Sequence, residues 1–335
     1  MSRFTIMNRI LLVTGAIIVA WLIALPFIPT GDGQEKQRDE FAGDQVGVGK
    51  PVPFDGKRAM GYLKAICDIG PRMSATPGMK KQQELIKKHF DDLGYKVTEQ
   101  KFEAKQKSQK KAVPMTNLIV SFWPEKHRRV ILCSHYDTRP IADQEPDPRD
   151  WREPFLSAND GGSGVAFLME MAHHMKGLST KVGVDFVLFD GEEYIFDNRR
   201  NADEYFFGSK HFAQTWKKDK NRSDYAAAVL MDMIAGKGAA FEVEPNSWHR
   251  AEPLCRQIWA IAQEQKCTAF PERVMDGEGV LDDHIPLLDA GIKAIDIIDW
   301  TYKHWHKLSD TPASCAPEGM EQVAKVLSVW MQRVK

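Results

Sequence analysis

The chain has 335 residues, of which 43% are hydrophobic and 27% are charged, a composition that permits a sizeable globular core. Its 45 basic and 46 acidic residues give a formal net charge of -1, which excludes an overall field that would recruit nucleic acid or an acidic polymer. The five cysteines contain no Cys-x-x-Cys pair and give no indication of a thiolate zinc site. An oxidising compartment would permit one disulfide, but the sequence does not select the pair.

The first thirty residues carry the pattern of a membrane anchor. Residues 10–28 contain no charged side chain, and Arg3 and Arg9 precede them without any acidic residue. This run is long enough to span a bilayer, and its basic flank is expected on the cytoplasmic side. The remainder of the chain is therefore expected outside the cytoplasm, in the periplasm or the extracellular space. Secretion after cleavage of a signal peptide is the alternative, although the run ends in two prolines, Pro26 and Pro29, rather than in a small-residue cleavage site.

Three parts of the chain differ in composition. Residues 1–30 are expected to form a cytoplasmic stub and the anchor helix, and residues 31–57 a flexible linker with few large apolar groups. Residues 58–335 are expected to form one catalytic domain. Within it, helical spacing of apolar residues predicts helices at 60–67, 79–93, 162–175, 248–265 and 317–334. Short apolar runs predict strands at 95–102, 117–123, 129–134, 182–189, 225–231 and 293–298.

The alternation of short buried strands with helices predicts the fold class. Such a chain forms an α/β domain with a central, mostly parallel mixed sheet and helices on both faces. In open sheets of this kind, the ligand site forms outside the carboxyl ends of the strands.

Side chains that bind metals follow the predicted strands at those ends. The set comprises His135, Asp137, Asp190, Glu192, Glu193, Asp232, His304 and His306, and Asp160 begins the helix at 162. Taken singly, an aspartate before a glycine-rich helix start is usually a cap, and a histidine in a loop is usually solvated. Capping does not explain why imidazoles and carboxylates gather at one edge of a sheet. Histidine and carboxylate ligands without thiolates suit zinc in a catalytic, water-accessible site.

The adjacent pair Glu192 and Glu193 is the most informative motif. Two carboxylates at the end of a buried strand repel each other unless a positive charge or a shared proton compensates. A metal ion that binds one and leaves the other as a general base gives each a function. The alternative is a capping acid beside a solvated neighbour.

At this point the sequence resembles a known family, the zinc aminopeptidase superfamily that also contains the glutaminyl cyclases. The resemblance covers nearly all of residues 58–335 in the family's order. Two stretches are similar to the glutaminyl-peptide cyclotransferases, Leu281-Asp282-Asp283-His284-Ile285-Pro286 and Asp232-Met233-Ile234 through Pro245-Asn246-Ser247. The long insert at 138–156 is similar to that of the bacterial members. The motifs of the superfamily are Ser134-His135-Tyr136-Asp137, Asn159-Asp160-Gly161-Gly162, Asp190-Gly191-Glu192-Glu193, Gly208-Ser209-Lys210-His211, Met231-Asp232 and Trp305-His306.

The resemblance implies roles for these residues. Asp160, Glu193 and His306 would hold a zinc ion, and Glu192 would transfer the proton. Asp232 and Asp282 would form an acidic hydrogen-bond network beside them. The aromatic candidates for the substrate pocket are Trp305 and Phe207, while Tyr194 is equally consistent with core packing. In the two-zinc aminopeptidases, the residues that match His135 and Asp232 bind a second metal ion. The cyclases tend to keep both side chains while using a single metal ion. One zinc ion is therefore preferred here, and a second stays open.

The resemblance also implies an activity. The expected reaction converts the N-terminal glutamine of a peptide or protein to pyroglutamate with release of ammonia, and zinc would act as a Lewis acid on the carboxamide. The alternative is a zinc-dependent aminopeptidase that hydrolyses N-terminal residues. A catalytically dead binding module is disfavoured because no ligand and no general base is missing. The expected partners are a peptide N-terminus and, through the anchor, a membrane, but no nucleic acid. The sequence does not indicate the oligomeric state.

Overall fold

The computed structural model describes residues 49–196 and 203–335. The predicted anchor at 1–30 and most of the predicted linker lie outside these residues. Within the described ranges, no helix combines the length and the apolar character that crossing a bilayer requires.

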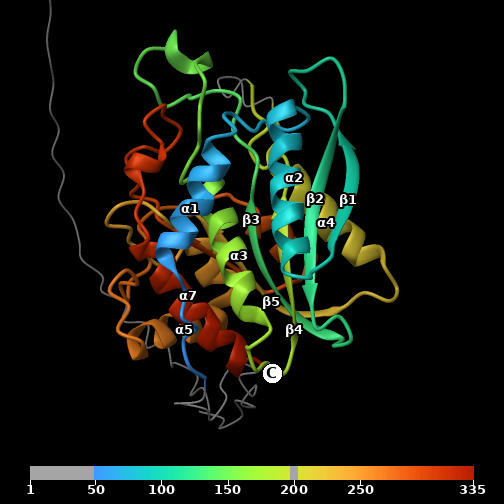
Figure 1. The fold of residues 1–335 in the computed structure, drawn as a ribbon, viewed down its shortest axis with the longest axis vertical. Helices are drawn as coiled ribbons and strands as arrows, with labels where there is room; N and C mark the ends of the chain where they lie inside the picture. Colours follow the sequence, from blue (N-terminus) through green and yellow to red (C-terminus); the bar gives the residue numbers. More distant parts are fainter. Residues whose placement is uncertain (1–48, 197–202) are drawn as a thin grey trace, which may run out of the picture. The chain divides into compact units, whose positions relative to one another are not determined.

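A six-stranded sheet in the order β1-β2-β4-β3-β5-β6 forms the centre of the domain (Figure 1). Strands β4, β3, β5 and β6 run parallel to one another, and β2 pairs antiparallel with both β1 and β4. The prediction of a mostly parallel mixed sheet is therefore confirmed. The strands are β1 (Val97–Ala104), β2 (Val113–Phe122), β3 (Arg128–His135), β4 (Gly183–Phe189), β5 (Asp224–Asp232) and β6 (Ala294–Ile298).

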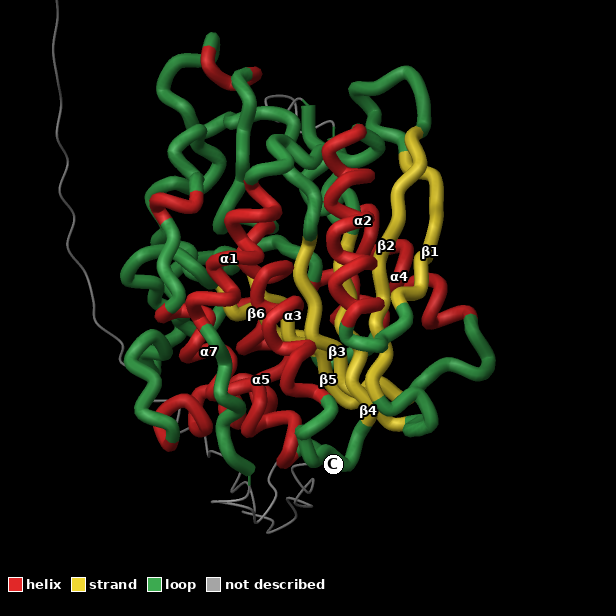
Figure 2. The backbone as a smooth tube through the Cα atoms, viewed as in Figure 1, coloured by secondary structure: helices red, strands yellow, loops and turns green. Residues whose placement is uncertain are grey.

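Helices cover both faces of this sheet, as predicted (Figures 1 and 2). One face carries α1 (Gly56–Cys67), α2 (Pro77–Asp92), α3 (Gly162–Met175) and α7 (Glu318–Arg333). The other carries α4 (Phe207–Lys218) and α6 (His284–Ala290), which pack against each other. Helix α5 (Pro245–Glu264) packs against β6, α6 and α7. Helices α4 and α6 were not predicted, because α6 has only 7 residues and α4 buries few of its side chains.

The register of the parallel strands brings their carboxyl ends to one edge. His135 at the end of β3 pairs with Phe189 at the end of β4, and Asp232 at the end of β5 pairs with Ile298 at the end of β6. These parallel strands are buried over nearly their whole length, which is the pattern expected for strands covered on both faces. The residues that follow each strand therefore emerge close together.

Residues 52–55, which precede the predicted start of the catalytic domain at 58, contact the domain. The Val52 amide donates to Ser328 Oγ at 3.2 Å, and the Phe54 ring stacks on Phe167 at 5.5 Å. Asp55 caps α1 by accepting from the Arg58 amide. Val52 and Phe54 are partly buried and pack against the core, and the bounds of the linker and of the catalytic domain stay predictions.

All five cysteines lie among the described residues, and each is a buried free thiol. The disulfide that an oxidising compartment would permit is not formed among them. Burial raises the pKa of the Cys67 thiol to about 11, so this thiol is not a nucleophile near neutral pH.

Candidate active site

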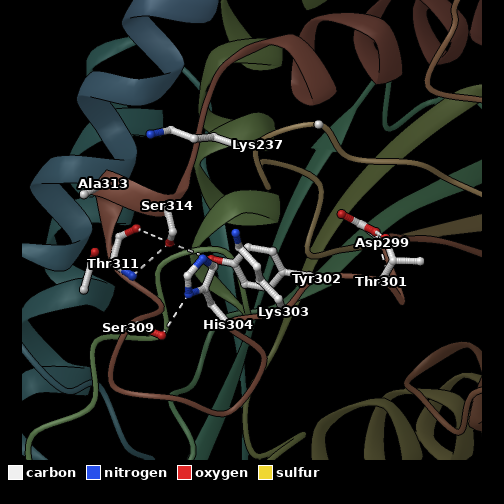
Figure 3. Close-up of a pocket in the computed structure, with 11 residues that line it drawn as sticks. Lys237, Asp299, Thr301, Tyr302, Lys303, His304, Ser309, Thr311, Ala313 and Ser314 are labelled. Atoms are coloured by element: carbon white, nitrogen blue, oxygen red, sulfur yellow. Dashed lines mark hydrogen bonds between the residues drawn. The ribbon is translucent and has the colours of Figure 1, made fainter.

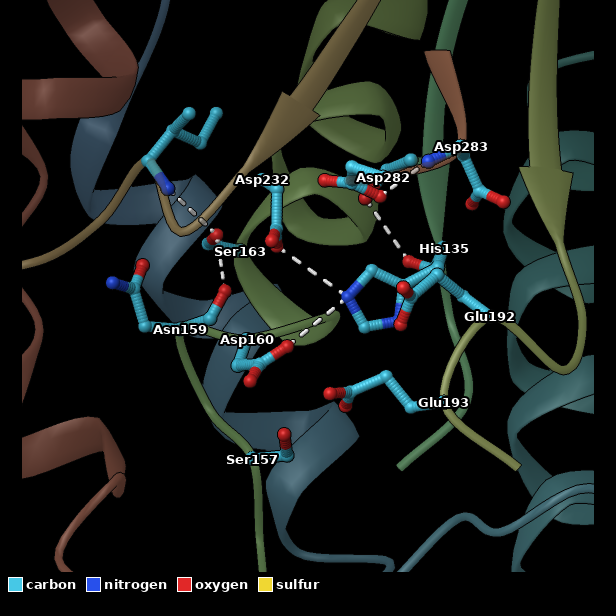
Figure 4. A network of polar contacts seen from close by, with 12 residues as sticks. His135, Ser157, Asn159, Asp160, Ser163, Glu192, Glu193, Asp232, Asp282 and Asp283 are labelled. Carbon is cyan, nitrogen blue, oxygen red and sulfur yellow. Dashed lines mark hydrogen bonds and ion pairs between the residues drawn. The ribbon is translucent and has the colours of Figure 1, made fainter. Parts of the chain in front are cut away.

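Predicted ligands from three strand ends, together with Asp160 ahead of α3, meet at the carboxyl edge of the sheet (Figure 4). His135 and Asp232 end β3 and β5, and Glu192 and Glu193 follow β4. Residues far apart along the chain thus share one small volume, because parallel strands end together.

Asp160, Glu193 and His306 form a group in which each residue offers one ligand atom within 4.8 Å of the others. His306 Nε2 lies 2.6 Å from Glu193 Oε1 and 3.6 Å from Asp160 Oδ2. All three residues are buried. These are the three residues that the resemblance implied as zinc ligands, and they lie where one ion could contact them all.

A second group overlaps with the first (Figure 4). His135 Nε2 lies 3.1 Å from Asp160 Oδ1 and 3.4 Å from Asp232 Oδ1, and the three residues could also hold a metal ion. Asp160 belongs to both groups. The geometry therefore accommodates either one metal ion beside an imidazole or a pair of ions that Asp160 bridges.

Two aspartates hold the ligand segments in place by accepting backbone hydrogen bonds. Asp137 accepts from the amides of Glu192 and Glu193, each at 3.1 Å. Asp310 accepts from the amide of Asp160 at 3.2 Å. Asp137 was noted at its strand end without a role, and Asp310 was missed, because a contact 150 residues away along the chain leaves no local pattern.

Gly161 makes the approach of Asp160 to His135 sterically feasible. Its φ of 74° lies in the left-handed region, and a Cβ atom there would stand 2.6 Å from His135 Cε1. A side chain at this position would displace the imidazole or the turn. Glycine is therefore required between Asp160 and α3.

The two adjacent glutamates differ in protonation. Burial and the neighbouring Glu193 carboxylate raise the pKa of Glu192 well above its usual range. Burial alone would also raise the pKa of Glu193, but the His306 imidazole outweighs it and holds that pKa at about 2. One glutamate is therefore a permanent anion suited to a cation, and the other is suited to accept and return a proton.

The rest of the cluster is strongly acidic. Burial and Glu193 raise the pKa of Asp160 to about 7, and burial and Asp232 raise the pKa of Asp282 well above its usual range. Such shifts arise where like charges crowd in a buried site. A divalent cation would relieve this repulsion.

Unpartnered ligand atoms provide an independent test of whether a metal fits. Among the described residues, Asp160 Oδ2, Glu193 Oε2 and Asp232 Oδ1 are buried and have no hydrogen-bond partner. Buried polar atoms without partners are costly and are normally satisfied. Two carboxylates and one imidazole, with room for a further ligand, form the donor set of a catalytic zinc site. The residues present therefore fit a zinc-type ion.

A cavity of about 440 Å³ opens onto this cluster. Glu192, Asp232 and Asp282 line it together with the three candidate ligands. Trp305 stacks on His306 with ring centroids 3.9 Å apart, and Trp300 lies 5.0 Å from Trp305. The cavity thus has an apolar aromatic wall beside a charged floor, which is the usual character of a small-molecule or peptide-end site.

The two aromatic candidates for the substrate pocket lie in different places. Trp305 lines the cavity, but Phe207 does not: it packs with Met115 and Tyr194 in a separate apolar cluster. Tyr205 and Phe206 line the cavity instead. Phe206 has a φ of 67°, and this left-handed turn directs its neighbour Phe207 away. Tyr194 belongs to core packing.

A second cavity of about 510 Å³ lies on the other side of the loop at 299–306 (Figure 3). Its side chains bond mainly with one another: Tyr302 Oη contacts Ser314 Oγ at 2.7 Å, and His304 Nδ1 contacts Ser309 Oγ at 2.8 Å. The described residues that line it contain none of the candidate metal groups. Among the described residues, His304 therefore belongs to none of the candidate metal groups, whereas His306 belongs to one.

Comparison with known proteins agrees with this geometry. The sequence model of Peptidase family M28 matches residues 117–331. The glutaminyl-peptide cyclotransferase of Drosophila melanogaster is 24% identical over 261 residues, which cover 72% of this chain and 70% of that protein. The structure of Fimbriiglobus ruber glutaminyl cyclase superposes with a TM-score of 0.82 at 51% identity, covering 85% of this chain and 97% of that one. A leucine aminopeptidase precursor from Bacteroides thetaiotaomicron has a TM-score of 0.76 at 26% identity, with 85% and 99% covered.

The fold and the site together define an α/β enzyme with a candidate metal site at the carboxyl edge of a mostly parallel sheet. The chain belongs to Peptidase family M28, whose model spans most of the described domain. The resemblance to the zinc aminopeptidase and glutaminyl cyclase superfamily is confirmed. Membership implies a zinc-type metal, and the buried group of Asp160, Glu193 and His306 offers it a site.

Proposed function

We propose that this protein is a glutaminyl-peptide cyclotransferase, an enzyme that converts an N-terminal glutamine of a peptide or protein to pyroglutamate and releases ammonia. The observation that carries the proposal is the likeness to the Fimbriiglobus ruber glutaminyl cyclase, which is 51% identical and is covered over 97% of its length. Family M28 alone would favour aminopeptidases equally.

Asp160, Glu193 and His306 hold a single zinc ion in this proposal. Support comes from their shared position, their burial and their unpartnered oxygen atoms. When bound, zinc supplies Lewis-acid polarisation of the substrate's side-chain carboxamide oxygen. His135 is not a ligand in this proposal and instead forms ion-pair contacts with Asp160 and Asp232, at 3.1 Å and 3.4 Å.

Glu192 transfers the proton. The free α-amine of the substrate attacks its own carboxamide carbon, a new carbon–nitrogen bond closes the five-membered ring, and the bond to the amide nitrogen breaks. Glu192 accepts the proton that the α-amine loses and returns it to the leaving nitrogen, which departs as ammonia. Burial and Glu193 raise its pKa above the usual range of a glutamate, which is the direction that a group exchanging protons with an amine requires.

Asp232 and Asp282 line the cavity beside Glu192 and form the acidic network around the substrate amine. Asp282 Oδ1 accepts from the Asp283 amide at 2.5 Å, which leaves Oδ2 unpartnered and buried. That oxygen is suited to accept a hydrogen bond from the ammonium or amine of the substrate. Trp305 packs against the substrate's aliphatic side chain.

A zinc aminopeptidase is the second candidate, and one observation favours it. His135, Asp160 and Asp232 form a second group that could hold a metal, and a related leucine aminopeptidase precursor superposes well. Hydrolysis requires an activated water molecule, which cyclisation does not because its nucleophile is within the substrate.

The two activities are separated by one incubation. The full chain with zinc is mixed with a peptide that begins with glutamine and with a matched peptide that begins with alanine, and the products are identified by mass spectrometry. We expect loss of ammonia from the first peptide and no change in the second. Release of a free amino acid from either peptide would identify an aminopeptidase and overturn the proposal.

The location of the enzyme is a further part of the proposal. We propose that residues 1–30 anchor the protein in a membrane, that residues 31–57 form a flexible linker, and that the catalytic domain lies in the periplasm or outside the cell. The uncharged run at 10–28 and the basic residues before it support this arrangement. Release after signal cleavage is the alternative, and membrane fractionation with an antibody to the domain distinguishes the two.

A further inference from the structure

The insert at 138–156 reaches the candidate zinc ligands from outside the sheet. It leaves the end of β3, passes through the short helix at Asp150–Arg152 and returns ahead of Asp160 (Figure 1). Two of its residues, Arg139 and Asp143, line the cavity and are buried. The resemblance gave neither residue a role.

Arg139 and Asp143 close a ring of contacts with two of the ligands. Asp143 Oδ1 lies 2.9 Å from His306 Nδ1, the ring nitrogen that faces away from Glu193. Arg139 contacts Asp143 Oδ2 at 3.0 Å and Glu193 Oε1 at 3.4 Å. His306 Nε2 completes the ring with Glu193 Oε1 at 2.6 Å. The insert therefore contacts both a carboxylate and an imidazole of the metal site.

The same insert also fastens the backbone around His306. The Gln144 amide donates to the His306 carbonyl at 3.2 Å, and the Leu308 amide donates to Glu145 Oε1 at 2.7 Å. This backbone needs support, because His306 has a φ of 53°, in the left-handed region that a residue other than glycine rarely adopts. Consecutive residues of the insert thus hold both the main chain and the side chain of His306.

We infer that Arg139 and Asp143 are positioning residues that orient Glu193 and His306 for zinc before the ion binds. The Asp143 carboxylate, 2.9 Å from Nδ1, favours the tautomer of His306 that carries its hydrogen on Nδ1, so that Nε2, on the side of Glu193, is the atom that would bind zinc. A carboxylate in this place also increases the basicity of the imidazole. Arg139 contacts both Asp143 and Glu193 and so fixes the positions of these two carboxylates relative to each other. The inference rests on the proposed zinc site and deepens it by assigning the insert its purpose.

Zinc affinity of the full chain tests this inference without relying on turnover. The affinity is measured by competition with a chromogenic chelator, and the absorption spectrum of the cobalt(II)-loaded protein reports ligand geometry. The variants are Asp143→Ala, Asp143→Asn and Arg139→Lys. Asp147→Asn is the matched control, because it removes a carboxylate from the same insert at a partly exposed position paired with Arg149.

We expect Asp143→Ala to weaken zinc binding by about 10-fold to 100-fold, the usual effect of removing a carboxylate partner of a metal-bound histidine. Asp143→Asn should lose less, because its amide oxygen still accepts from Nδ1. Arg139→Lys keeps the positive charge but cannot contact Glu193 and Asp143 through two separate guanidinium nitrogens. Any loss of zinc affinity and any change in the cobalt spectrum would therefore report the loss of these paired contacts. The control should match wild type.

Each outcome decides between structural and positioning roles. If the Asp143 and Arg139 variants bind zinc as tightly as Asp147→Asn and give its cobalt spectrum, the inference is overturned. If Asp143→Ala fails to fold, judged by circular dichroism, the isosteric Asp143→Asn decides. Wild type that binds zinc without cyclising glutamine peptides would sink the proposed function and leave this inference standing, whereas wild type that binds no zinc would sink both.

Discussion

Replacement of Glu192 by glutamine removes the proposed proton-transfer group while changing little else. The side chain is buried and lines the cavity, and glutamine has nearly the same volume. The three candidate ligands remain, so the variant should keep its zinc. What it loses is the capacity to accept a proton from the substrate amine and to return it to the leaving nitrogen.

The expected loss follows from the worth of a positioned acid-base group. Such a group contributes about 10²-fold to 10⁴-fold in rate, which corresponds to about 2.7 to 5.4 kcal/mol of transition-state stabilisation. We expect about 10³-fold here, because one carboxylate serves both proton transfers. Burial and Glu193 raise the pKa of Glu192 above its usual range, which is the direction that a group exchanging protons with an amine requires.

Ammonia release from a glutamine-initiated peptide, followed by a coupled dehydrogenase assay, measures the effect. Zinc content is determined in the same preparation, and Glu153→Gln, an exposed glutamate of the insert, is the matched control. A Glu192→Gln protein that retains zinc and turns over at the wild-type rate would refute the assignment of Glu192.

Three further predictions follow from other parts of the molecule. Removal of zinc by a chelator should abolish cyclisation and lower the melting temperature, since a ligand at about a thousand times its Kd contributes about 4 kcal/mol to the folded state; calorimetry that shows no shift on re-addition of zinc would contradict this. Leu281 is 70% exposed and Trp300 43% exposed, and both line the cavity. Leu281→Ser should therefore raise KM about tenfold for peptides with an apolar second residue. An equal rise in KM for peptides with glycine as the second residue would argue against an apolar cavity entrance. Burial alone would raise the pKa of Glu170, but hydrogen bonds from His174 and Arg58 outweigh it and lower that pKa from 4.5 to about 2. The stabilisation, on the order of 3 kcal/mol, is therefore present above about pH 4.5 and lost as the pH falls towards 2. In Glu170→Gln, the midpoint of urea denaturation should therefore depend less on pH across that interval. An unchanged pH dependence would show that the contacts of Glu170 with His174 and Arg58 contribute nothing to stability.

The sheet and its site were predictable because parallel strands end together. Continuous apolar runs located β3, β4, β5 and β6 nearly to the residue, and the metal-binding side chains that follow them could then be placed at one edge. Strand β1 was predicted two residues early, since its alternating polar and apolar residues extend into the preceding turn. Local patterns therefore sufficed wherever burial was continuous.

The missed residues depend on loops. Arg139 and Asp143 lie in an insert without periodic apolar spacing, and Asp143 meets His306 across 163 positions of the chain, which no local pattern encodes. The choice among Tyr205, Phe206 and Phe207 as cavity lining depends on the left-handed turn at Phe206, and an aromatic run in the sequence does not specify that turn. Side-chain direction in such loops follows from tertiary contacts.

The central claim is tested most directly by diffraction from crystals of the zinc-loaded protein at wavelengths on both sides of the zinc absorption edge. The account predicts one anomalous peak, contacted by a carboxylate oxygen of Asp160, a carboxylate oxygen of Glu193 and Nε2 of His306, with the Glu192 carboxylate beside it and unbound. A second peak of equal height between His135 and Asp232, or zinc bound without His306, would contradict it.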